Sequence, residues 1–454
     1  MAQNLVDAVR AAGVIGAGGA GFPTHVKVSA SVDTVIANGA ECDPLLQSDQ
    51  RLMEIHASEI VQGVVLAMEA TGASRGILAL KDEYGAAISA FRRAVAEQQR
   101  AADLSLLLME SRYPAGDEFV LVYEATGRLV PETGLPLQVG CLVQNVQTLY
   151  NIARASRGEP VTHRLLTIAG AVARPATLWA PVGTALGDVL DWAGGIQPPR
   201  WSQRSADDYA VVVGGPMMGW VAVDLAESVA KTTTGLLVLP RDNAVVRYMT
   251  RTSASWVRRG ISTCDQCRDC TDLCPRYLLG HELEPHEVMR AINYGLDRPA
   301  DKVTAAVLCC ECRLCEAYAC PLELSPMAYY VGIKKELREQ GWINDVHKKV
   351  ELEPHLMREY RLVPTHRLTA RLGLTEWEEQ VCPLDERDYR PGRVSIALDQ
   401  QIGAPARPAV SGGQQVAVGD LIAEIPDKAL GANVHASIAG RVSRVTESAI
   451  EILA

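Results

Sequence analysis

The cysteines of this chain are gathered in one short stretch, and their spacing constrains the fold more than any other feature. Nine of the 12 cysteines lie between residues 264 and 320 of a 454-residue sequence. Eight of the nine form two similar runs, CxxCxxCxxxCP and CxxCxxCxxxxCP. The candidate ligands are Cys264, Cys267, Cys270 and Cys274 in the first run, and Cys309, Cys312, Cys315 and Cys320 in the second.

This spacing is typical of two 4Fe–4S clusters. Two-residue spacers let three thiolates bind one cluster, while the fourth Cys, placed before Pro, ligates the other cluster. A pair of structural zinc sites is the alternative, but zinc ligands commonly come in paired CxxC units, which a triple-Cys run does not match. Cys310 lies beside Cys309, so the first ligand of the second run stays open, and the spacing favours Cys309. The predicted sets are Cys264, Cys267, Cys270 with Cys320, and Cys309, Cys312, Cys315 with Cys274.

The composition, 48% hydrophobic and 22% charged residues, is that of a globular protein with several domains. Dispersed Lys and Arg and a net charge of −10 argue against a nucleic-acid partner. The sequence has no uninterrupted apolar run of about 18 residues and no signal-peptide pattern, so we expect no membrane partner and a cytoplasmic location. In that reducing compartment clustered thiols are more often metal ligands than disulfides. The isolated Cys42, Cys141 and Cys382 are expected to be inert.

A glycine-rich loop, GAGGAGFPTHVK at residues 16–27, contains the GxGxxG spacing of dinucleotide-binding folds. That fingerprint needs a strand before it and a helix after it. Here residues 4–15 have apolar positions at helical spacing, and residues 32–41 are rich in β-branched residues typical of a strand. The order of elements around the loop is therefore the reverse of the one in dinucleotide-binding folds. The glycines still suit a phosphate, because they let backbone N–H groups approach it closely.

The loop and three further segments resemble known flavoproteins. GAGGAGFPTHVK and NGAECDP (38–44) are similar to the flavin loop of the NADH-oxidising subunit of respiratory complex I, and more closely to the RnfC component of the Rnf electron-transport complex. YPAGDEFVLV (113–122) and VGCLVQNVQT (139–148) resemble further Rnf-type motifs. The resemblance implies an FMN site, with no catalytic side chain because hydride transfer belongs to the cofactors. The implied FMN residues are Gly16, Gly18, Gly19, Lys27, Asn38, Glu41, Gly116, Asp117, Glu118, Asn145 and Thr148, and Phe22, Lys27 and Asp43 are expected to face the nicotinamide nucleotide.

Two further parts of the chain resemble domains of the same families. Residues 163–240 read as short strands, one short helix and further strands, similar to an SLBB β-grasp module, and the glycines of VVVGGPMMG (211–219) are expected to pack against the flavin domain. Residues 393–453 alternate apolar and turn positions like a barrel-sandwich hybrid domain. The charged stretch 333–362 is expected to be a mostly helical, solvated cover.

The predicted fold class is multidomain, α/β and α+β. A complex I flavoprotein-like FMN/NADH-binding domain is expected over 1–155 and the SLBB β-grasp domain over 160–245. A helical ferredoxin-like domain with two 4Fe–4S clusters is expected over 250–380, and an all-β barrel-sandwich hybrid over 388–454.

The order of these domains is similar to that of the cobalamin reductase family of propanediol-utilisation microcompartments. In the Rnf component the barrel-sandwich domain is N-terminal, whereas here it is C-terminal. The resemblance implies electron transfer from NADH through FMN and the clusters to cob(III)alamin or cob(II)alamin, inside a bacterial microcompartment. It implies a corrinoid adenosyltransferase and shell or enzyme proteins as partners, with a homo-oligomer as a further expectation. The need for a flavin follows from the cofactors, since a hydride carrier delivers electrons in pairs and iron–sulfur clusters take them singly.

Three other functions stay open at this level. An Rnf-type membrane-complex component would have the same cofactors and another acceptor, and copurification with membrane partners would identify it. A soluble diaphorase module could feed a hydrogenase or formate dehydrogenase. A non-enzymatic interaction module would purify colourless, without iron or flavin.

Overall fold

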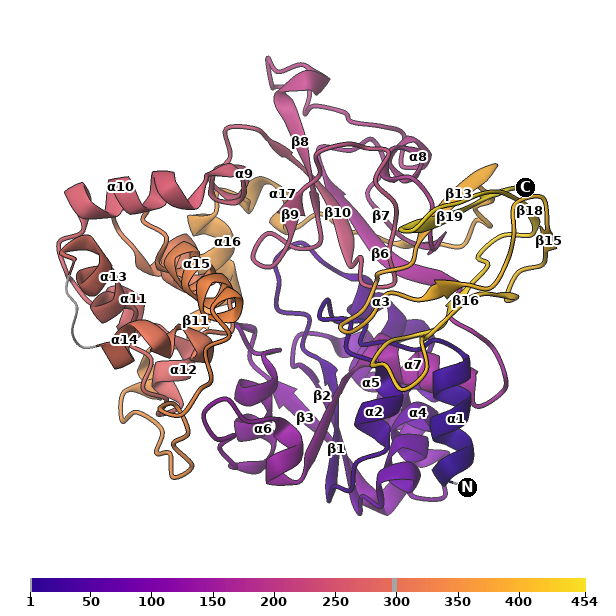
Figure 1. Ribbon diagram of the computed structural model, residues 1–454, viewed down its shortest axis with the longest axis horizontal. Helices are drawn as coiled ribbons and strands as arrows, with labels where there is room; N and C mark the ends of the chain where they lie inside the picture. The colour runs from indigo at the N-terminus through magenta and orange to yellow at the C-terminus, as the bar shows by residue number, and fades with distance from the viewer. Residues whose placement is uncertain (1, 296–299) are drawn as a thin grey trace.

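The chain folds into a helical lobe, a central pair of sheets and a β-rich C-terminal lobe. The computed structural model describes residues 2–295 and 300–454. Figure 1 shows the helices α10–α15 on one side of the molecule and the last strands, β13–β19, on the opposite side. Between them lie one sheet built from β6–β10 and, below it in this view, the helices and strands of the N-terminal part. Within those ranges, no helix combines the length and the apolar character that a bilayer crossing needs.

The N-terminal part is a parallel sheet covered by helices. Its strand order is β3-β2-β1-β5, and every neighbouring pair is parallel. Strands β1, β2 and β5 are short apolar runs buried on both faces, as expected between two layers of helices, whereas the edge strand β3 is partly exposed. The elements are α1 (Ala2–Ala11), α2 (Thr24–Val28), β1 (Thr34–Gly39), α3 (Ser48–Ile55), α4 (Ala57–Thr71), β2 (Arg75–Lys81), α5 (Gly85–Ala96), β3 (Leu104–Met109), β4 (Arg112–Tyr113), α6 (Glu118–Thr126), β5 (Cys141–Asn145) and α7 (Val146–Ala155).

The helix before the glycine loop and the strand after it are confirmed, as α1 and β1. The short helix α2 between the loop and β1 was not predicted, because THVKV is too short to show a helical period. In the sheet, β1 pairs with β2 on one side and β5 on the other, so the chain order reverses between β1 and β5. This reversal determines where a ligand can enter.

The second sheet is mixed, in the order β12-β7-β6-β10-β8-β9. Strands, a short helix and further strands appear as the sequence predicts. Its edge strand β12 (Leu384–Asp385) comes from much later in the chain and pairs with β7. The other elements are β6 (His163–Gly170), β7 (Ala176–Pro181), α8 (Leu186–Trp192), β8 (Tyr209–Val213), β9 (Trp220–Val221) and β10 (Gly235–Pro240).

The cysteine-rich part is helical, but its charged stretch is not mostly helical as predicted. Helix α15 ends at Glu339 and is followed by irregular chain, with Gly341 in the left-handed region at φ 63°. Nor is the stretch entirely solvated, since Arg358 is buried. The helices are α9 (Ala244–Thr250), α10 (Ser253–Thr263), α11 (Asp269–Asp272), α12 (Pro275–Leu278), α13 (Pro285–Asn293), α14 (Ala300–Thr304), η4 (Ala305–Leu308), η5 (Cys315–Ala319), α15 (Pro326–Glu339), η6 (Arg358–Tyr360), α16 (Thr365–Arg371) and α17 (Thr375–Glu378).

The C-terminal lobe consists of two small sheets around one apolar core. Their orders are β13-β19-β18-β15 and β14-β16-β17. The lobe touches the glycine loop, because the Ile402 N–H donates to the Gly21 carbonyl at 3.0 Å. The strands are β13 (Arg393–Ala397), β14 (Arg407–Pro408), β15 (Gln415–Val416), β16 (Leu421–Glu424), β17 (Val434–His435), β18 (Gly440–Val445) and β19 (Ala449–Leu453).

Lys231 is buried where three parts of the chain meet. Its Nζ donates to the carbonyl oxygens of Gly13 and Asn433, both at 2.8 Å. Burial lowers the pKa of Lys231 to about 7, from an ordinary value of 10.5. Between these values the unfolded chain holds a proton that the folded chain has lost, so the free energy of unfolding rises with pH.

Replacing Lys231 with Met should remove this pH dependence. The measured quantity is the unfolding free energy of the wild type minus that of the variant. We expect this difference to increase with rising pH, by at most about 1.4 kcal/mol per pH unit between pH 7 and 10.5. Urea unfolding at several pH values measures this difference. Lys335, whose side chain is 76% exposed, gives the control Lys335→Met. Parallel pH profiles for wild type and Lys231→Met would contradict the assignment.

Candidate functional site

The chain order reverses between β1 and β5, which makes a switch point at the carboxyl ends of these two strands; we call this edge of the sheet the crevice. In open α/β sheets, ligands bind at such a switch point. Asn38 on β1 is paired in register with Asn145, the last residue of β5. The Asn38 side chain donates to the Gly116 carbonyl at 2.9 Å, which brings the loop before α6 to the same edge. The topology therefore gathers these three predicted flavin residues in one place.

The glycine loop lies over the start of α7. The Ala17 N–H donates to the hydroxyl of Thr148 at 2.8 Å, and a Cβ on Gly18 would lie 3.5 Å from Asn145 Cβ. Gly19 has φ +109°, and a Cβ there would meet nothing within 4 Å. Within residues 2–295 and 300–454, the backbone N–H groups of Gly18, Gly19 and Ala20 donate to no acceptor of the chain. Consecutive free N–H groups in an open loop fit a phosphate.

Lys27 adds a positive charge at this edge. Its Nζ lies 2.6 Å from Glu118 Oε1 and donates to the Val143 carbonyl at 3.3 Å. The Glu118 side chain is still 41% exposed, so this ion pair reaches the solvent side of the crevice. Phe22 is also part of the loop, where its carbonyl accepts from the Gly16 N–H at 2.8 Å.

Three of the predicted site carboxylates have partners within the chain. Glu41 accepts from the N–H groups of Asp49 and Gln50 at the start of α3, both at 3.0 Å, and burial raises its pKa. Asp117 caps α6 by accepting from the N–H groups of Phe119 and Val120 at 3.0 and 3.2 Å. Asp43 reaches the loop after β8 in the second sheet. These acids hold elements together, a role that the motif resemblance did not indicate.

Asp43 joins the N-terminal part to the loop after β8. Its carboxylate accepts from the N–H groups of Met217 and Met218 at 2.9 and 3.3 Å, and burial raises its pKa to about 7. A Cβ on Gly215 would lie 2.1 Å from this carboxyl group, so Gly215 packs against the N-terminal part as predicted, whereas Gly214 and Gly219 face their own sheet and loop. On its other side, the Met217 carbonyl accepts from Arg313 Nε at 2.8 Å. The loop therefore lies between the crevice and the second cysteine run.

The eight predicted ligand cysteines line two cavities in the arrangement that their spacing predicts. One small cavity is lined by Cys264, Cys267, Cys270 and Cys320. We call these four the outer set. The other small cavity is lined by Cys274, Cys309, Cys312 and Cys315, which we call the inner set, and by Cys310. Each set therefore takes three thiols from one run and the fourth from the other.

The donors around the inner cavity fit an iron–sulfur cluster. Four thiols supply the ligands that such a cluster uses. Tyr330 also lines this cavity, is 1% exposed, and has a hydroxyl with no hydrogen-bonding partner in the described part of the chain. A buried hydroxyl without a partner costs free energy. The sulfides of a bound cluster would accept from it.

The two runs share a backbone pattern that aligns their residues. Gln266 and Arg268 have φ of 63° and 73°, and Glu311 and Arg313 have φ of 59° and 64°. Left-handed non-glycine residues are uncommon, so a pair of them at the same spacing in both runs shows which residues of the two runs correspond. It aligns Cys264 with Cys309, and Cys310 with Asp265. The Glu311 N–H also donates to Cys309 Sγ at 3.3 Å. The geometry favours Cys309 as the ligand.

The second run contains one more residue than the first, between Cys315 and Cys320. The corresponding segment of the first run is the short α-helix α11. In the second run, η5 is a π-helix, which holds one extra residue in its turn. The insertion is thereby absorbed without moving the last cysteine away from its cavity.

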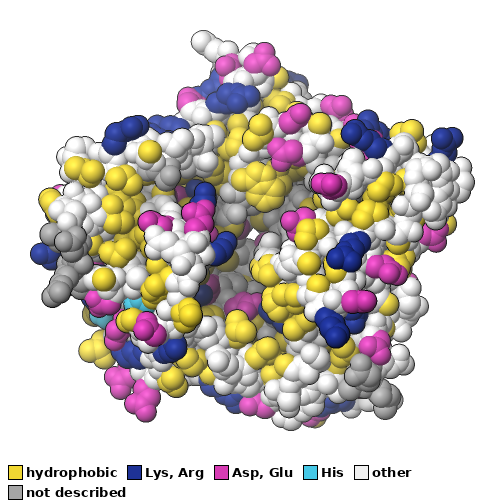
Figure 2. All heavy atoms as spheres, in the orientation of Figure 1, with side chains coloured by type: hydrophobic (Ala, Val, Ile, Leu, Met, Phe, Trp, Pro, Cys, Tyr) yellow, Lys and Arg dark blue, Asp and Glu magenta, His cyan; other side chains and the backbone are white. Residues whose placement is uncertain are grey.

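The inner set lies against the crevice. The Tyr113 hydroxyl donates to the Cys312 carbonyl at 2.7 Å. Arg276, two residues after Cys274, makes two hydrogen bonds to Asp117 at 2.7 and 3.0 Å and lies 3.8 Å from the centre of the Phe119 ring. Figure 2 shows the face of Figure 1 hollowed near its centre, beside the helical lobe. A cofactor in the crevice and one on the inner set would be neighbours.

Comparison with protein families gives four matches along the chain. Residues 9–154 match the Nuo51 FMN-binding domain and residues 165–221 the SLBB domain. Residues 263–325 match the 4Fe-4S dicluster domain and residues 383–452 the RnfC barrel sandwich hybrid domain. The predicted multidomain fold class is confirmed.

Two curated relatives are similar over the whole length. The cobalamin reductase PduS of Citrobacter freundii is 45% identical over 453 residues, covering 100% of this chain and 97% of the relative. The same protein of Salmonella typhimurium strain LT2 is 44% identical over the same shares. Among solved structures, an NAD+-reducing [NiFe]-hydrogenase in the H2-reduced state matches 77% of this chain and 64% of its own, with 23% identity and a TM-score of 0.48. The chain belongs to the family of the cobalamin reductase PduS.

Proposed function

We propose that this protein is an NADH-dependent cobalamin reductase that uses FMN and two 4Fe–4S clusters. One NADH gives up two electrons and becomes NAD+ with release of a proton, and each cob(III)alamin takes one electron to become cob(II)alamin. The observation that carries the proposal is the contact of the inner cysteine set with the switch-point crevice through Tyr113, Arg276 and Arg313. The activity named for the two relatives supports cobalamin as the acceptor.

In this proposal the chain binds and positions the cofactors. The free N–H groups of Gly18, Gly19 and Ala20, with Lys27 nearby, bind the FMN phosphate. Asn38, Gly116, Asn145 and Thr148 shape the crevice, and Glu118 holds Lys27 in place. When bound, FMN accepts a hydride and iron–sulfur clusters pass electrons singly. The remaining proposed FMN residues are Gly16, Glu41 and Asp117.

The nicotinamide nucleotide is proposed to bind next to the glycine loop. Phe22 lies in the glycine loop and Lys27 in the short helix α2 that follows it, and we propose that the nicotinamide nucleotide binds beside them. Asp43, also proposed for this role, already accepts two backbone hydrogen bonds. We infer that Asp43 acts on the nucleotide through the position of the loop after β8. The name PduS supports an association with propanediol-utilisation microcompartments, and we propose a corrinoid adenosyltransferase and shell or enzyme proteins as the partners there.

The test is omission of one cofactor at a time. The protein is reconstituted anaerobically with iron, sulfide and FMN, and NADH-dependent formation of cob(II)alamin is followed by absorbance. We expect activity only with all three additions. Full activity without FMN, or without iron and sulfide, would contradict the proposal.

Replacing Tyr330 with Phe should make the inner cluster harder to reduce. Hydrogen bonds to cluster sulfur raise the reduction potential because they stabilise the more negative reduced state. We therefore expect a lower midpoint potential for one cluster in EPR-monitored titrations, with the other unchanged. Tyr329→Phe is the control on the same helix, since the Tyr329 hydroxyl already donates to Asn293 Oδ1 at 2.9 Å. An unchanged potential in Tyr330→Phe would show that this hydroxyl does not act on the cluster.

A further inference from the structure

The C-terminal lobe contacts the glycine loop on both sides of its apex. On one side, the Ile402 N–H of the lobe donates to the Gly21 carbonyl at 3.0 Å. On the other side, Lys231 Nζ donates to the carbonyl oxygens of Gly13 and of Asn433 in the lobe, each at 2.8 Å. Figure 1 shows loops of this lobe, drawn in yellow, reaching the helices of the N-terminal part. The loop proposed to bind the FMN phosphate is therefore attached to the far end of the chain.

The glycine loop is closed at its neck by hydrogen bonds of its own. The Gly16 N–H donates to the Phe22 carbonyl at 2.8 Å, and the Gly21 N–H donates to the Gly16 carbonyl at 3.2 Å. Residues 18–20, whose N–H groups are free, form the apex beyond this neck. Because the neck is closed, a shift of the chain at Gly21 would carry the apex with it. The contacts of the lobe thus act on the position of the free N–H groups.

Gln400 of the lobe connects the contacts on the two sides. Its Oε1 accepts from the Lys231 N–H at 2.9 Å, and its Nε2 donates to the Ala397 carbonyl at 2.7 Å. Gln400 is 7% exposed and Lys231 is 4% exposed. A buried polar group that loses its partner is not solvated in return, so such hydrogen bonds are costly to break. The contacts between lobe and loop therefore form one buried network.

The packing at Gly21 leaves little room on the side of the lobe. Gly21 has φ +66°, and a Cβ there would lie 3.1 Å from the Gln400 carbonyl oxygen and 3.3 Å from Gln401 Cα. Thr232 Cγ2 would be 3.2 Å away. Non-bonded heavy atoms usually meet at roughly 3.5–4.0 Å. A methyl group on Gly21 would therefore press on the lobe and on the chain beside Lys231.

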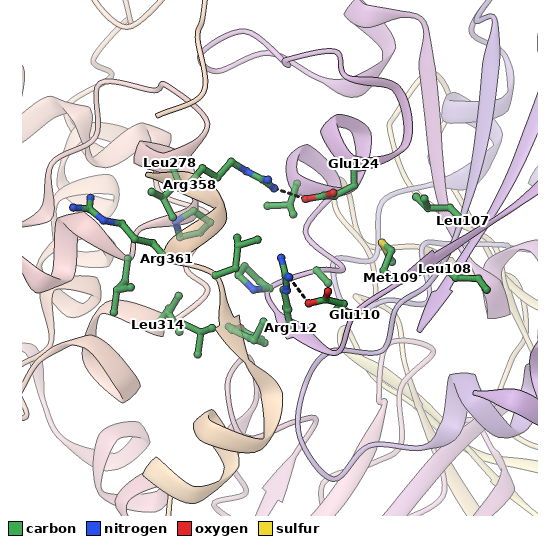
Figure 3. Close-up of a pocket in the computed structure, with 18 residues that line it drawn as sticks. Leu107, Leu108, Met109, Glu110, Arg112, Glu124, Leu278, Leu314, Arg358 and Arg361 are labelled. Carbon is green, nitrogen blue, oxygen red and sulfur yellow. Dashed lines mark hydrogen bonds and ion pairs between the residues drawn. The ribbon is translucent and has the colours of Figure 1, made fainter. Parts of the chain in front are cut away.

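The helical lobe contacts the N-terminal part at a different place. Arg358 forms an ion pair with Glu124 of α6 beside a cleft of about 210 Å³ (Figure 3). Strand β3 lines the same cleft, and its Leu108 is 42% exposed. This ion pair joins two parts of the chain without involving the glycine loop. It therefore offers a comparison for the contacts of the C-terminal lobe.

We propose that the C-terminal lobe is a positioning element of the FMN site, with Gln400, Ile402 and Lys231 as its positioning residues. The lobe fixes the neck of the glycine loop, so the free N–H groups at the apex are held ready for the phosphate. Donors that are ordered before binding cost less free energy to order on binding. The inference rests on the proposed function, since the FMN phosphate is taken from there.

FMN should in turn stabilise the contacts of the lobe. If these contacts raise the affinity for FMN, bound FMN must favour them by the same factor. The Ile402 N–H should therefore exchange with deuterium more slowly in the FMN-bound protein than in the FMN-free protein. Hydrogen-exchange mass spectrometry of a peptide that contains Ile402 measures this difference. A peptide that contains β19 is the reference, because β19 pairs only with β13 and β18 of the lobe among the described strands.

The main test measures FMN affinity in variants that disturb the contact. Gly21→Ala presses on the lobe, and Gln400→Met removes the acceptor of the Lys231 N–H at similar side-chain size, in case Gly21→Ala does not fold. Gly72→Ala is the matched control, since Gly72 has φ +76° and a Cβ there would meet nothing within 4 Å. Glu124→Gln alters the contact with the helical lobe instead.

Flavin fluorescence titration of the protein with reconstituted clusters gives the FMN dissociation constant. We expect an increase of at least tenfold in Gly21→Ala and Gln400→Met, and a value within twofold of wild type in Gly72→Ala and Glu124→Gln. Iron content and urea unfolding verify that each variant is folded.

Three results would overturn the inference. The first is wild-type FMN affinity in folded Gly21→Ala and Gln400→Met. The second is equal weakening in Gly72→Ala or Glu124→Gln, because FMN affinity would then follow the general stability of the fold. The third is an exchange rate at Ile402 that FMN does not change. Weaker FMN binding in the two lobe-contact variants, with no NADH-dependent cob(II)alamin formation by the wild type, would support the inference and contradict the proposed function.

Discussion

Cys309→Ala should remove one of the two clusters, whereas Cys310→Ala should leave both in place. Cys309 occupies the position equivalent to Cys264 in the repeated left-handed backbone pattern of the two runs, and Cys310 the position of Asp265. Iron and sulfide analysis of the reconstituted variants, with EPR of the reduced protein, measures the loss. For Cys309→Ala we expect half of the wild-type iron and at least a hundredfold slower NADH-dependent cob(II)alamin formation.

Each variant is the control for the other, because both thiols line the inner cavity and both substitutions remove one thiol from it. A destabilised fold would lower FMN content as well as iron, so FMN content identifies that case. Full iron in Cys309→Ala together with half of the iron in Cys310→Ala would show that the register is shifted by one residue.

Gly18→Asp should abolish FMN binding while leaving the apo fold intact. Gly18 is exposed. A Cβ added to Gly18 would lie 3.5 Å from its nearest neighbour, Asn145 Cβ, so the chain accommodates a small side chain. A carboxylate there would face the phosphate proposed to lie on the free N–H groups. Two like charges about 4 Å apart repel by about 4 kcal/mol at an effective dielectric constant of about 20. We expect the FMN dissociation constant to rise at least a hundredfold, measured by flavin fluorescence.

Gly18→Asn is the matched control, since its side chain has the shape and reach of Asp without the charge. Its FMN affinity should stay within about tenfold of wild type, and the unfolding free energies of both apo variants should stay within about 0.5 kcal/mol, as for other surface substitutions. Equal FMN affinity of Gly18→Asp and wild type would place the phosphate elsewhere.

The local features of both sites could be predicted from the sequence. The spacing predicts that the last cysteine of each run joins the three thiols of the other run: Cys320 joins the first run and Cys274 the second. The fourth cysteine of each run lies beyond the reach of its own loop. The helix before the glycine loop and the strand after it follow from apolar periodicity. The FMN residues came only from resemblance to flavoprotein motifs.

The contacts between distant segments could not be predicted. Asp43 and Asp117 read as site acids in the motifs, yet their partners, Met217 and Arg276, lie more than 150 residues further on. The pairing of β1 with β5 that creates the crevice is equally non-local. The charged stretch 333–362 was predicted to be mostly helical from composition, but its helix ends at Glu339 and Arg358 is buried against Tyr123 and Glu124.

In the proposed function, electrons enter from NADH on FMN and leave to cobalamin. The most direct measurement is an anaerobic single turnover: fully reconstituted protein is mixed with one equivalent of NADH and an excess of hydroxocobalamin, and flavin and corrinoid absorbance are followed together. We predict rapid bleaching of the flavin, followed by its recovery as two equivalents of cob(II)alamin form. A flavin that NADH does not bleach, or that stays bleached while the corrinoid remains cob(III)alamin, would contradict the account.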